Sequence, residues 1–327
     1  APSPGATSTP SPSTTPTATV TPASLLPPAT PVSATVAPHT AAPRDPDAFL
    51  AYVQSVAGPT RDLADLARRL APRSAATPAP VATQVTRVTG SKDTFWVADM
   101  TNMRHFTVTA TLRVVSERLH MYVDDTRRGI SVDALRSSAR VFDEQTHPTT
   151  RRYFGDAWAP GWDGDERISV LHTRNLGAAG AFSSADEETA AGNPFSNGRH
   201  MIYINADQLK PGTRGYDSVL AHEFQHAIHF FQDRNEDAWV NEGASMLNEY
   251  LNGFGSGQSF VDAFVRYPHT QLTDWSDQPD IAAHYGAAFA FVAYVHERYG
   301  DAALWTLIAE DANGADGFDR MLERLGK

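Results

Sequence analysis

A stretch between Ala221 and Asn252 constrains the fold of this chain more than any other part of the sequence. His222 and His226 lie four residues apart, so on an α-helix their imidazoles project from one face, at a separation that one metal ion can bridge. Glu223 lies beside them, where its carboxylate can reach a water molecule on that ion without displacing it. This stretch therefore predicts a helix with a metal-binding face and Glu223 as a general base.

A third metal ligand is expected from another element, because a catalytic zinc ion usually takes three protein ligands. The polar run from Gln232 to Asp237 predicts a turn, after which helical spacing resumes and places Glu242 and Glu249 on one face. Glu242 is the candidate third ligand. Glu249 and Asn241 are candidates for hydrogen bonds that hold the ligand side chains in place. His229 also lies on the ligand face, but we expect it to pack or hydrogen-bond inside the protein, because a fourth ligand would close the site.

The residues around this motif resemble those of the gluzincin metallopeptidases, in which HExxH is followed by a helix that carries a glutamate ligand. The segment WVNEGA, from Trp239 to Ala244, is similar to WLNEGFA of the membrane alanyl aminopeptidase family. Wider similarity, over roughly residues 90 to 300, is to the hyicolysin-type bacterial secreted metallopeptidases, through the segments FWVAD, MYVDD, HMIYINA and HYGAAFAFVAYVHERYG. The resemblance implies zinc as cofactor and a zincin-like α+β fold with a β-rich N-terminal part, a central active-site helix and a helical C-terminal part.

The same resemblance suggests roles for two further parts of the chain. A tyrosine or histidine downstream of the glutamate ligand commonly stabilises the oxyanion in gluzincins, and Tyr285 is the candidate here, with a core tyrosine as the alternative. In zinc peptidases the edge of a strand next to the active-site helix pairs with the substrate backbone. The candidate substrate-binding residues at that edge are Gly177, Ala178, Ala179 and Gly180.

The expected function is that of a zinc-dependent metalloendopeptidase acting on protein or peptide substrates. Zinc lowers the pKa of its bound water, and Glu223 takes the proton and passes it to the leaving amine. An aminopeptidase is disfavoured because the chain has no GxMEN stretch. The alternative from another class is a non-catalytic cell-surface or adhesion module on a peptidase-like fold.

Charge and composition exclude several other classes. A net charge of −11 disfavours a nucleic-acid-binding protein, because phosphate binding needs clustered Lys and Arg. The absence of cysteine excludes thiol catalysis, thiolate ligands and disulfides. No run of 18 apolar residues is present, so we expect no transmembrane segment. The oligomeric state is left open.

Four regions follow one another along the chain. Residues 1–43 consist almost entirely of Ala, Pro, Ser, Thr and Val, which predicts a disordered linker of the kind that tethers a secreted or extracellular domain, with a disposable flexible tail as the alternative. Residues 44–83 are expected to be a helical arm or a propeptide-like segment, with one or two short helices from Asp47 to Leu70. Residues 84–215 are expected to form a β-rich subdomain, and residues 216–327 a helical subdomain with the zinc site.

Spacing of apolar residues predicts the elements of these two subdomains. The expected strands are Thr94 to Val97, Phe106 to Val115, Leu119 to Val123, Arg167 to His172 and Met201 to Ile204. Besides the two motif helices, the expected helices are Val132 to Phe142, Ile281 to Tyr299, Ala302 to Ala309 and Phe318 to Leu325. Asp217 is expected to cap the first motif helix, and Gly243 to allow close approach of the two motif helices.

Two acidic runs are alternative sites for calcium. One comprises Asp163, Asp165 and Glu166, and the other Asp186, Glu187 and Glu188. Neither has EF-hand spacing, so a solvated acidic loop is the favoured interpretation of both.

Overall fold

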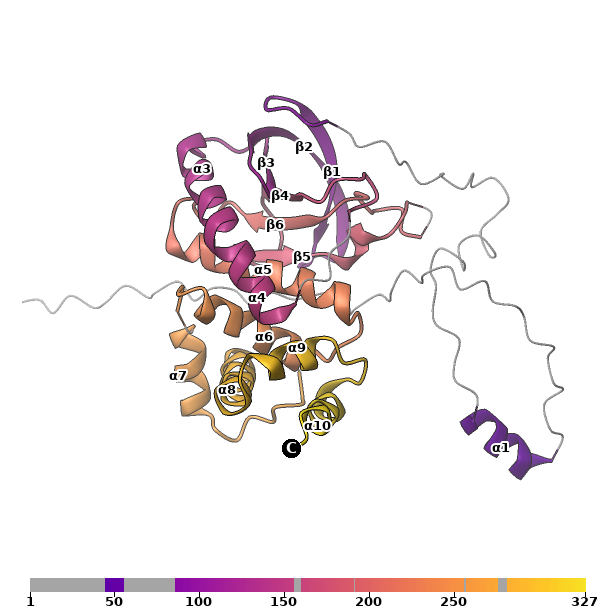
Figure 1. Ribbon diagram of the computed structural model, residues 1–327. Coiled ribbons are helices and arrows are strands. Elements are labelled where there is room, and N and C mark those ends of the chain that lie inside the picture. The colour runs from indigo at the N-terminus through magenta and orange to yellow at the C-terminus, as the bar shows by residue number, and fades with distance from the viewer. Residues whose placement is uncertain (1–44, 56–85, 156–159, 191, 256, 276–280) are drawn as a thin grey trace, which may run out of the picture.

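A curled sheet of six strands, together with a set of helices, forms the protein in the computed structural model (Figure 1). The structure describes residues 45–55, 86–155, 160–190, 192–255, 257–275 and 281–327. The linker predicted for residues 1–43 lies outside the described residues, as does most of the arm predicted for residues 44–83. Of that arm the structure describes helix α1, Pro46–Ser55. The predicted mixed α+β class is confirmed.

The sheet combines an antiparallel meander with two parallel neighbours. Its strands are β1 (Lys92–Asp99), β2 (Arg104–Val115), β3 (Leu119–Asp124), β4 (Ile168–Thr173), β5 (Gly180–Phe182) and β6 (Met201–Asn205). Their order is β1-β2-β3-β4-β6-β5, with β3, β4 and β6 parallel and the edge strand β5 antiparallel to β6. The five predicted strands are confirmed with small shifts at their ends. The short strand β5 begins at Gly180, the last of the four candidate substrate-binding residues.

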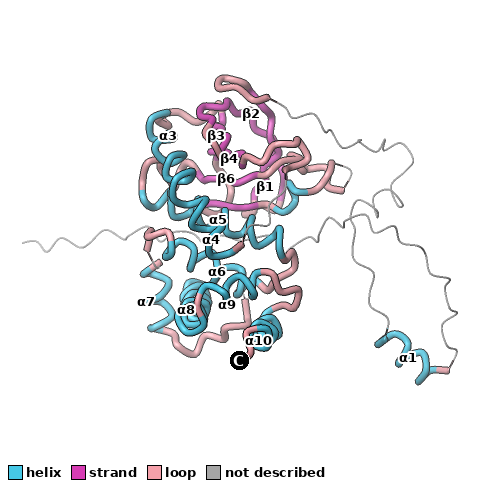
Figure 2. Tube along the Cα trace, viewed as in Figure 1, coloured by secondary structure: helices cyan, strands magenta, loops and turns pink. Residues whose placement is uncertain are grey.

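Helices occupy one side of the sheet and the region below it, as Figure 2 shows. Those before the motif are α3 (Val132–Val141), the π-helical turn η1 (Phe142–Thr146), α4 (His147–Phe154) and the 3₁₀ turn η2 (Ser184–Glu187). Those from the motif onward are α5 (Arg214–Gln232), α6 (Ala238–Leu251), α7 (Gln258–Arg266), α8 (Ile281–Tyr299), α9 (Asp301–Ile308) and α10 (Gly314–Arg324). The helices predicted between Val132 and Leu325 are confirmed, whereas α4, η1, η2 and α7 were not predicted. Among the described residues, no helix is both long and apolar enough to cross a membrane.

The two faces of the sheet have separate hydrophobic cores. Successive residues of a strand point to opposite faces, so Val170 of β4 belongs to one core and Leu171 to the other. The larger core joins Val170 to apolar residues of α5, including Leu220 and Phe224. These residues lie on the side of α5 that faces the sheet, which leaves its opposite side to the histidines of the motif.

Thr213, rather than Asp217, caps helix α5. Thr213 has extended backbone angles, and its hydroxyl accepts a hydrogen bond from the backbone N–H of Tyr216. The backbone N–H of Asp217 already donates to the carbonyl of Thr213, so Asp217 lies within the first turn. The cap predicted at Asp217 is therefore wrong, because the helix begins one turn earlier than its apolar pattern indicated.

Close approach at Gly243 is confirmed, but the partner helix is α8 and not α5. A Cβ atom added to Gly243 would lie 2.7 Å from the carbonyl oxygen of Ala288 and 2.8 Å from Cγ2 of Val292. Only a glycine fits where the backbones of two helices come this close. Helix α6, which carries the candidate ligand Glu242, is thus fixed by α8 on one side and α5 on the other.

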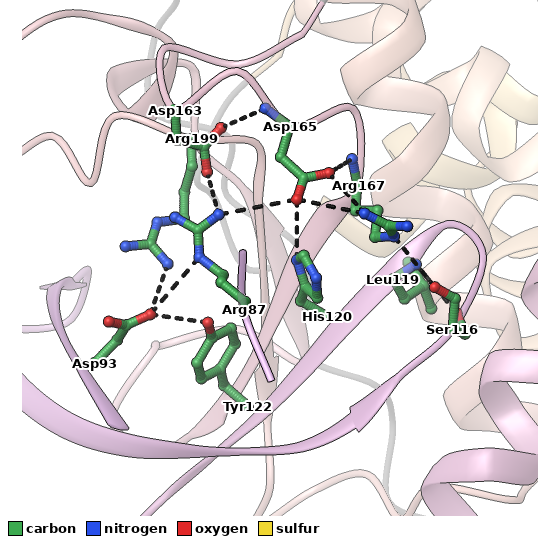
Figure 3. Close-up of polar contacts among 10 residues, drawn as sticks. All are labelled: Arg87, Asp93, Ser116, Leu119, His120, Tyr122, Asp163, Asp165, Arg167 and Arg199. Carbon is green, nitrogen blue, oxygen red and sulfur yellow. Dashed lines mark hydrogen bonds and ion pairs between the residues drawn. The ribbon is translucent and has the colours of Figure 1, made fainter. Parts of the chain in front are cut away.

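A buried arginine, Arg87, connects the segment before β1 to the loop before β4 (Figure 3). The guanidinium of Arg87 lies 2.8 Å from the carboxylate of Asp163 and 3.9 Å from that of Asp165. Arg167 also pairs with Asp165, at 3.3 Å. Asp165 is buried, so the solvated loop predicted for this acidic run is wrong at that position, because arginines from elsewhere in the sequence neutralise its charge.

Candidate metal centre

Three side chains from α5 and α6 converge in the interior. Nε2 of His222 lies 3.1 Å from Oε2 of Glu242, and Nε2 of His226 lies 3.5 Å from the same oxygen. One donor atom from each residue lies within 4.8 Å of the others. All three side chains are buried. The spacing of the motif thus brings the predicted ligands together around one point, and two imidazole nitrogens with one carboxylate oxygen are donors that zinc accepts.

The connection between the two helices makes this convergence possible. Helix α5 ends at Gln232 and α6 begins at Ala238, so the predicted turn is confirmed. His222 and His226 are one helical turn apart on α5, with ring centroids separated by 4.8 Å. Glu242 lies in the second turn of α6, facing both rings.

The far nitrogen of each imidazole is held by a hydrogen-bond acceptor. Nδ1 of His222 is 2.8 Å from Oε1 of Glu249, and Nδ1 of His226 is 2.9 Å from Oδ1 of Asn241. The hydrogen bonds predicted for Glu249 and Asn241 are therefore present. In the neutral imidazole, an acceptor at Nδ1 places the proton there and leaves the lone pair on Nε2, which is the tautomer that a metal ligand requires.

The charges of the three residues are balanced against one another. Burial by itself would raise the pKa of Glu242, but His226 and His222 lower it to about 2. Burial would lower the pKa of His222, but hydrogen bonds to Glu242 and Glu249 raise it well above its ordinary range. Nε2 of His226 is buried without a hydrogen-bond partner of ordinary geometry in the described chain. A metal ion would satisfy this atom, so the residues present fit a bound cation.

Glu223 lies between this cluster and the edge strand. Its Oε2 accepts a hydrogen bond from the backbone N–H of Phe182, at 2.8 Å, and its side chain is fully buried. Burial raises the pKa of Glu223, although His222 and His226 act in the opposite direction. A carboxylate whose pKa is raised above its ordinary value accepts a proton more readily, which suits it to the role of a general base.

The predicted substrate-binding residues have different surroundings. A Cβ atom on Gly180 would lie 2.6 Å from Cγ1 of Val219 and 2.9 Å from Oε1 of Glu223, so the backbone of β5 touches the candidate base. Gly177, with φ of +77°, lies instead against Met100 and Thr101.

Ala178 and Ala179 are buried before β5 begins. Their carbonyl oxygens accept hydrogen bonds from the side chain and the backbone of Asn205, respectively. Of the four residues, Gly180 is therefore the one that the described contacts bring against Glu223.

Tyr285 of α8 lies beside the candidate ligand and is also a core residue. Its ring packs against Phe260 and Trp275, with centroid distances of 5.2 Å and 4.9 Å. Its hydroxyl interacts with Glu242, and burial together with the nearby carboxylates of Glu242 and Glu223 raises its pKa well above the ordinary range. Tyr285 is thus protonated and able to donate a hydrogen bond within the site.

Two further polar residues of the centre were not predicted. The hydroxyl of Ser218 donates to Glu249, and that of Ser245 lies 3.0 Å from Nδ1 of His226. Helical spacing contained a signal for both, because Ser218 precedes His222 by four residues and Ser245 follows Glu242 by three.

The second acidic run is buried rather than solvated. Asp186 accepts hydrogen bonds from the hydroxyl of Tyr203, at 2.5 Å, and from the backbone N–H of Asn197, at 2.7 Å. Glu187 contacts Nδ1 of His200 at 3.0 Å, and Glu188 is buried as well. The solvated loop predicted here is wrong, because distant residues supply the partners of these carboxylates.

No protein-family model matches the chain, and no curated protein is significantly similar to it in sequence.

Proposed function

We propose that this chain is a gluzincin-type, zinc-dependent metalloendopeptidase with a zincin-like fold. The observation that supports this most directly is the convergence of Nε2 of His222 and Nε2 of His226 on Oε2 of Glu242, with Glu223 alongside. The three residues would hold the ion, and Glu249 and Asn241 would orient the two imidazoles.

The residues around the ion would divide the reaction between them. Bound zinc would supply Lewis acidity, which activates water and polarises the substrate carbonyl. Glu223 takes a proton from the attacking water and delivers it to the leaving amine nitrogen. The hydroxyl of Tyr285 donates a hydrogen bond to the oxygen on which negative charge develops.

The edge strand β5 is the proposed site for the substrate backbone. Strand β5 is the last strand of the sheet, and the N–H of Phe182 is directed at Glu223 rather than at another strand. An extended peptide added along this edge would bring its carbonyl groups past the candidate base. The proposed substrates are therefore proteins or peptides in extended conformation, outside the cell.

A non-catalytic module is the second candidate, and one observation favours it. Glu223 is fully buried, so substrate has to displace its contact with β5 before reaction can occur. A protein that retained the metal only for stability would have no need for such an opening.

Zinc content and casein hydrolysis, measured on the same preparations, test the proposal. Glu223→Gln keeps an oxygen that accepts the Phe182 N–H, so we expect zinc to stay bound while hydrolysis falls by at least about 10²-fold. His226→Ala should lose both zinc from this site and hydrolysis, whereas His269→Ala, at an exposed position, should retain both.

Equal hydrolysis by wild type and Glu223→Gln would refute the role of Glu223. Zinc binding without hydrolysis in the wild type would favour the non-catalytic module, and comparison of blocked with unblocked peptides separates endopeptidase from aminopeptidase.

A further inference from the structure

A second group of potential metal ligands lies where α5 ends and turns toward α6. His229 belongs to the last turn of α5, and Asp233 and Glu236 belong to the connection that follows. One donor atom from each of the three lies within 4.8 Å of the others. The side chains are almost completely buried, with exposures of 1%, 6% and 9%, respectively.

Each of these side chains has a buried atom without a hydrogen-bond partner. Oδ1 of Asp233 accepts from the backbone N–H of Asn235, and Oε1 of Glu236 accepts from the backbone N–H groups of Asp237 and Gly314. The other oxygen of each carboxylate has no partner in the described chain. Backbone groups thus hold one oxygen of each carboxylate and leave the second one available, as in oriented metal ligands.

His229 provides independent evidence that this is more than an acidic cluster. Neither of its ring nitrogens has a hydrogen-bond partner of ordinary geometry among the described residues. Burial, with the nearby His226, lowers the pKa of His229 to about 3, although Asn241 acts in the opposite direction. The ring is therefore neutral at physiological pH and retains a lone pair for a cation. With Asn241 as its hydrogen-bonding neighbour, the ring still has a buried nitrogen without a partner, and a bound ion would satisfy that nitrogen.

The charges around the group also favour a cation. Burial raises the pKa of Glu236 to about 7, and burial together with Asp311 and Glu310 raises that of Asp233. In the described chain no Lys or Arg forms an ion pair with either carboxylate. Arg234 stacks on the ring of Phe230, at 4.7 Å. A divalent ion would supply the missing positive charge.

We propose that His229, Asp233 and Glu236 form a second metal site, which binds a divalent transition metal such as zinc and fixes the connection between α5 and α6. An imidazole nitrogen suits zinc and its neighbours in the transition series, whereas calcium prefers oxygen ligands alone. The site shares no residue with the centre formed by His222, His226 and Glu242, so it stands whether or not that centre is catalytic.

The stoichiometry of zinc in the full chain tests the proposal. We expect two zinc ions in the wild type, one in His226→Ala and one in the double variant Asp233→Asn/Glu236→Gln. The triple variant, which combines all three substitutions, should bind none. Both amide substitutions keep the oxygens that accept the backbone N–H groups, so the variants are designed to fold, which circular dichroism verifies. Asp311→Asn lies in the same acidic surroundings but outside the proposed ligand set, and it should retain two ions.

Thermal unfolding of His226→Ala gives a second measurement that does not require the double variant. Added zinc should raise its Tm in a concentration-dependent manner, because an ion that binds only the folded state stabilises it. Two ions in the double variant, or no zinc-dependent rise in the Tm of His226→Ala, would overturn the second site. A single zinc ion in the wild type that is lost in His226→Ala would also overturn the second site, although it would support the first centre.

Discussion

Replacement of Gly243 by alanine tests how tightly helix α6 is held against α8. Two effects of opposite sign compete at this position. Alanine inside a helix is favoured over glycine by about 1 kcal/mol. The new Cβ, however, would lie 2.7 Å from the carbonyl oxygen of Ala288, a backbone atom that cannot rotate away. Forcing an extra carbon into a packed interior costs about 1–3 kcal/mol, and the rigid neighbour puts this case at the upper end.

The net expectation is a loss of about 1–2 kcal/mol in the free energy of unfolding, which for a domain of this size lowers the Tm by about 2–8 °C. Gly215→Ala is the matched control, because Gly215 lies in the first turn of α5 and an added Cβ there meets no atom within 4 Å. The control should raise the Tm by about 1–4 °C.

Differential scanning calorimetry of both variants, with and without added zinc, measures these changes in Tm. Since Glu242 is the neighbour of Gly243, displacement of α6 should also weaken zinc binding in Gly243→Ala but not in the control. A Gly243→Ala protein that melts at or above the wild-type Tm would show that the close approach of α6 and α8 does not exist in solution.

Two further predictions concern buried charges. Burial raises the pKa of Asp186 to about 7 from its ordinary 3.8, so the folded protein holds a proton that the unfolded chain releases, and stability falls as the pH rises between these values. Asp186→Asn should remove about 2 kcal/mol of the decrease in the free energy of unfolding between pH 5 and pH 8, as measured by urea titration, and an unchanged decrease would contradict the assignment. Arg87→Met removes the cation that pairs with Asp163, leaves Asp165 with Arg167 alone, and should cost about 3–5 kcal/mol. The exposed Arg136→Met should cost less than about 1 kcal/mol in the same assay, and similar losses in the two variants would argue against the buried network.

Local patterns predicted the parts of this protein whose partners are close in sequence. Alternating residues predicted β2 and β3, and the spacing of His222, His226 and Glu242 predicted that they would meet, because each signal lies within one or two adjacent elements. Strand β5 is only three residues long, which is too short for a period of two to be recognised.

Contacts between distant segments account for most of what the sequence did not reveal. Asp186 appeared to belong to a solvated loop because its partner Tyr203 lies 17 positions away and is recognisable only in the folded chain. Gly243 indicated a close approach, but no local pattern could identify α8 as the helix that approaches it. Helix α7 has an amphipathic pattern, but the glycines before it and its short length concealed it.

The short chain distance between the candidate zinc ligands has a consequence for the order of folding. His222 and Glu242 are 20 positions apart, so bringing them together closes a small loop, at a small cost in chain entropy. Phe182 has to reach Glu223 across 41 positions, and the parallel pairs β3–β4 and β4–β6 join residues 49 and 32 positions apart. Contacts of low sequence separation form first in most chains, so the α5–α6 hairpin is positioned to nucleate the helical half, while docking of the edge strand onto Glu223 comes late.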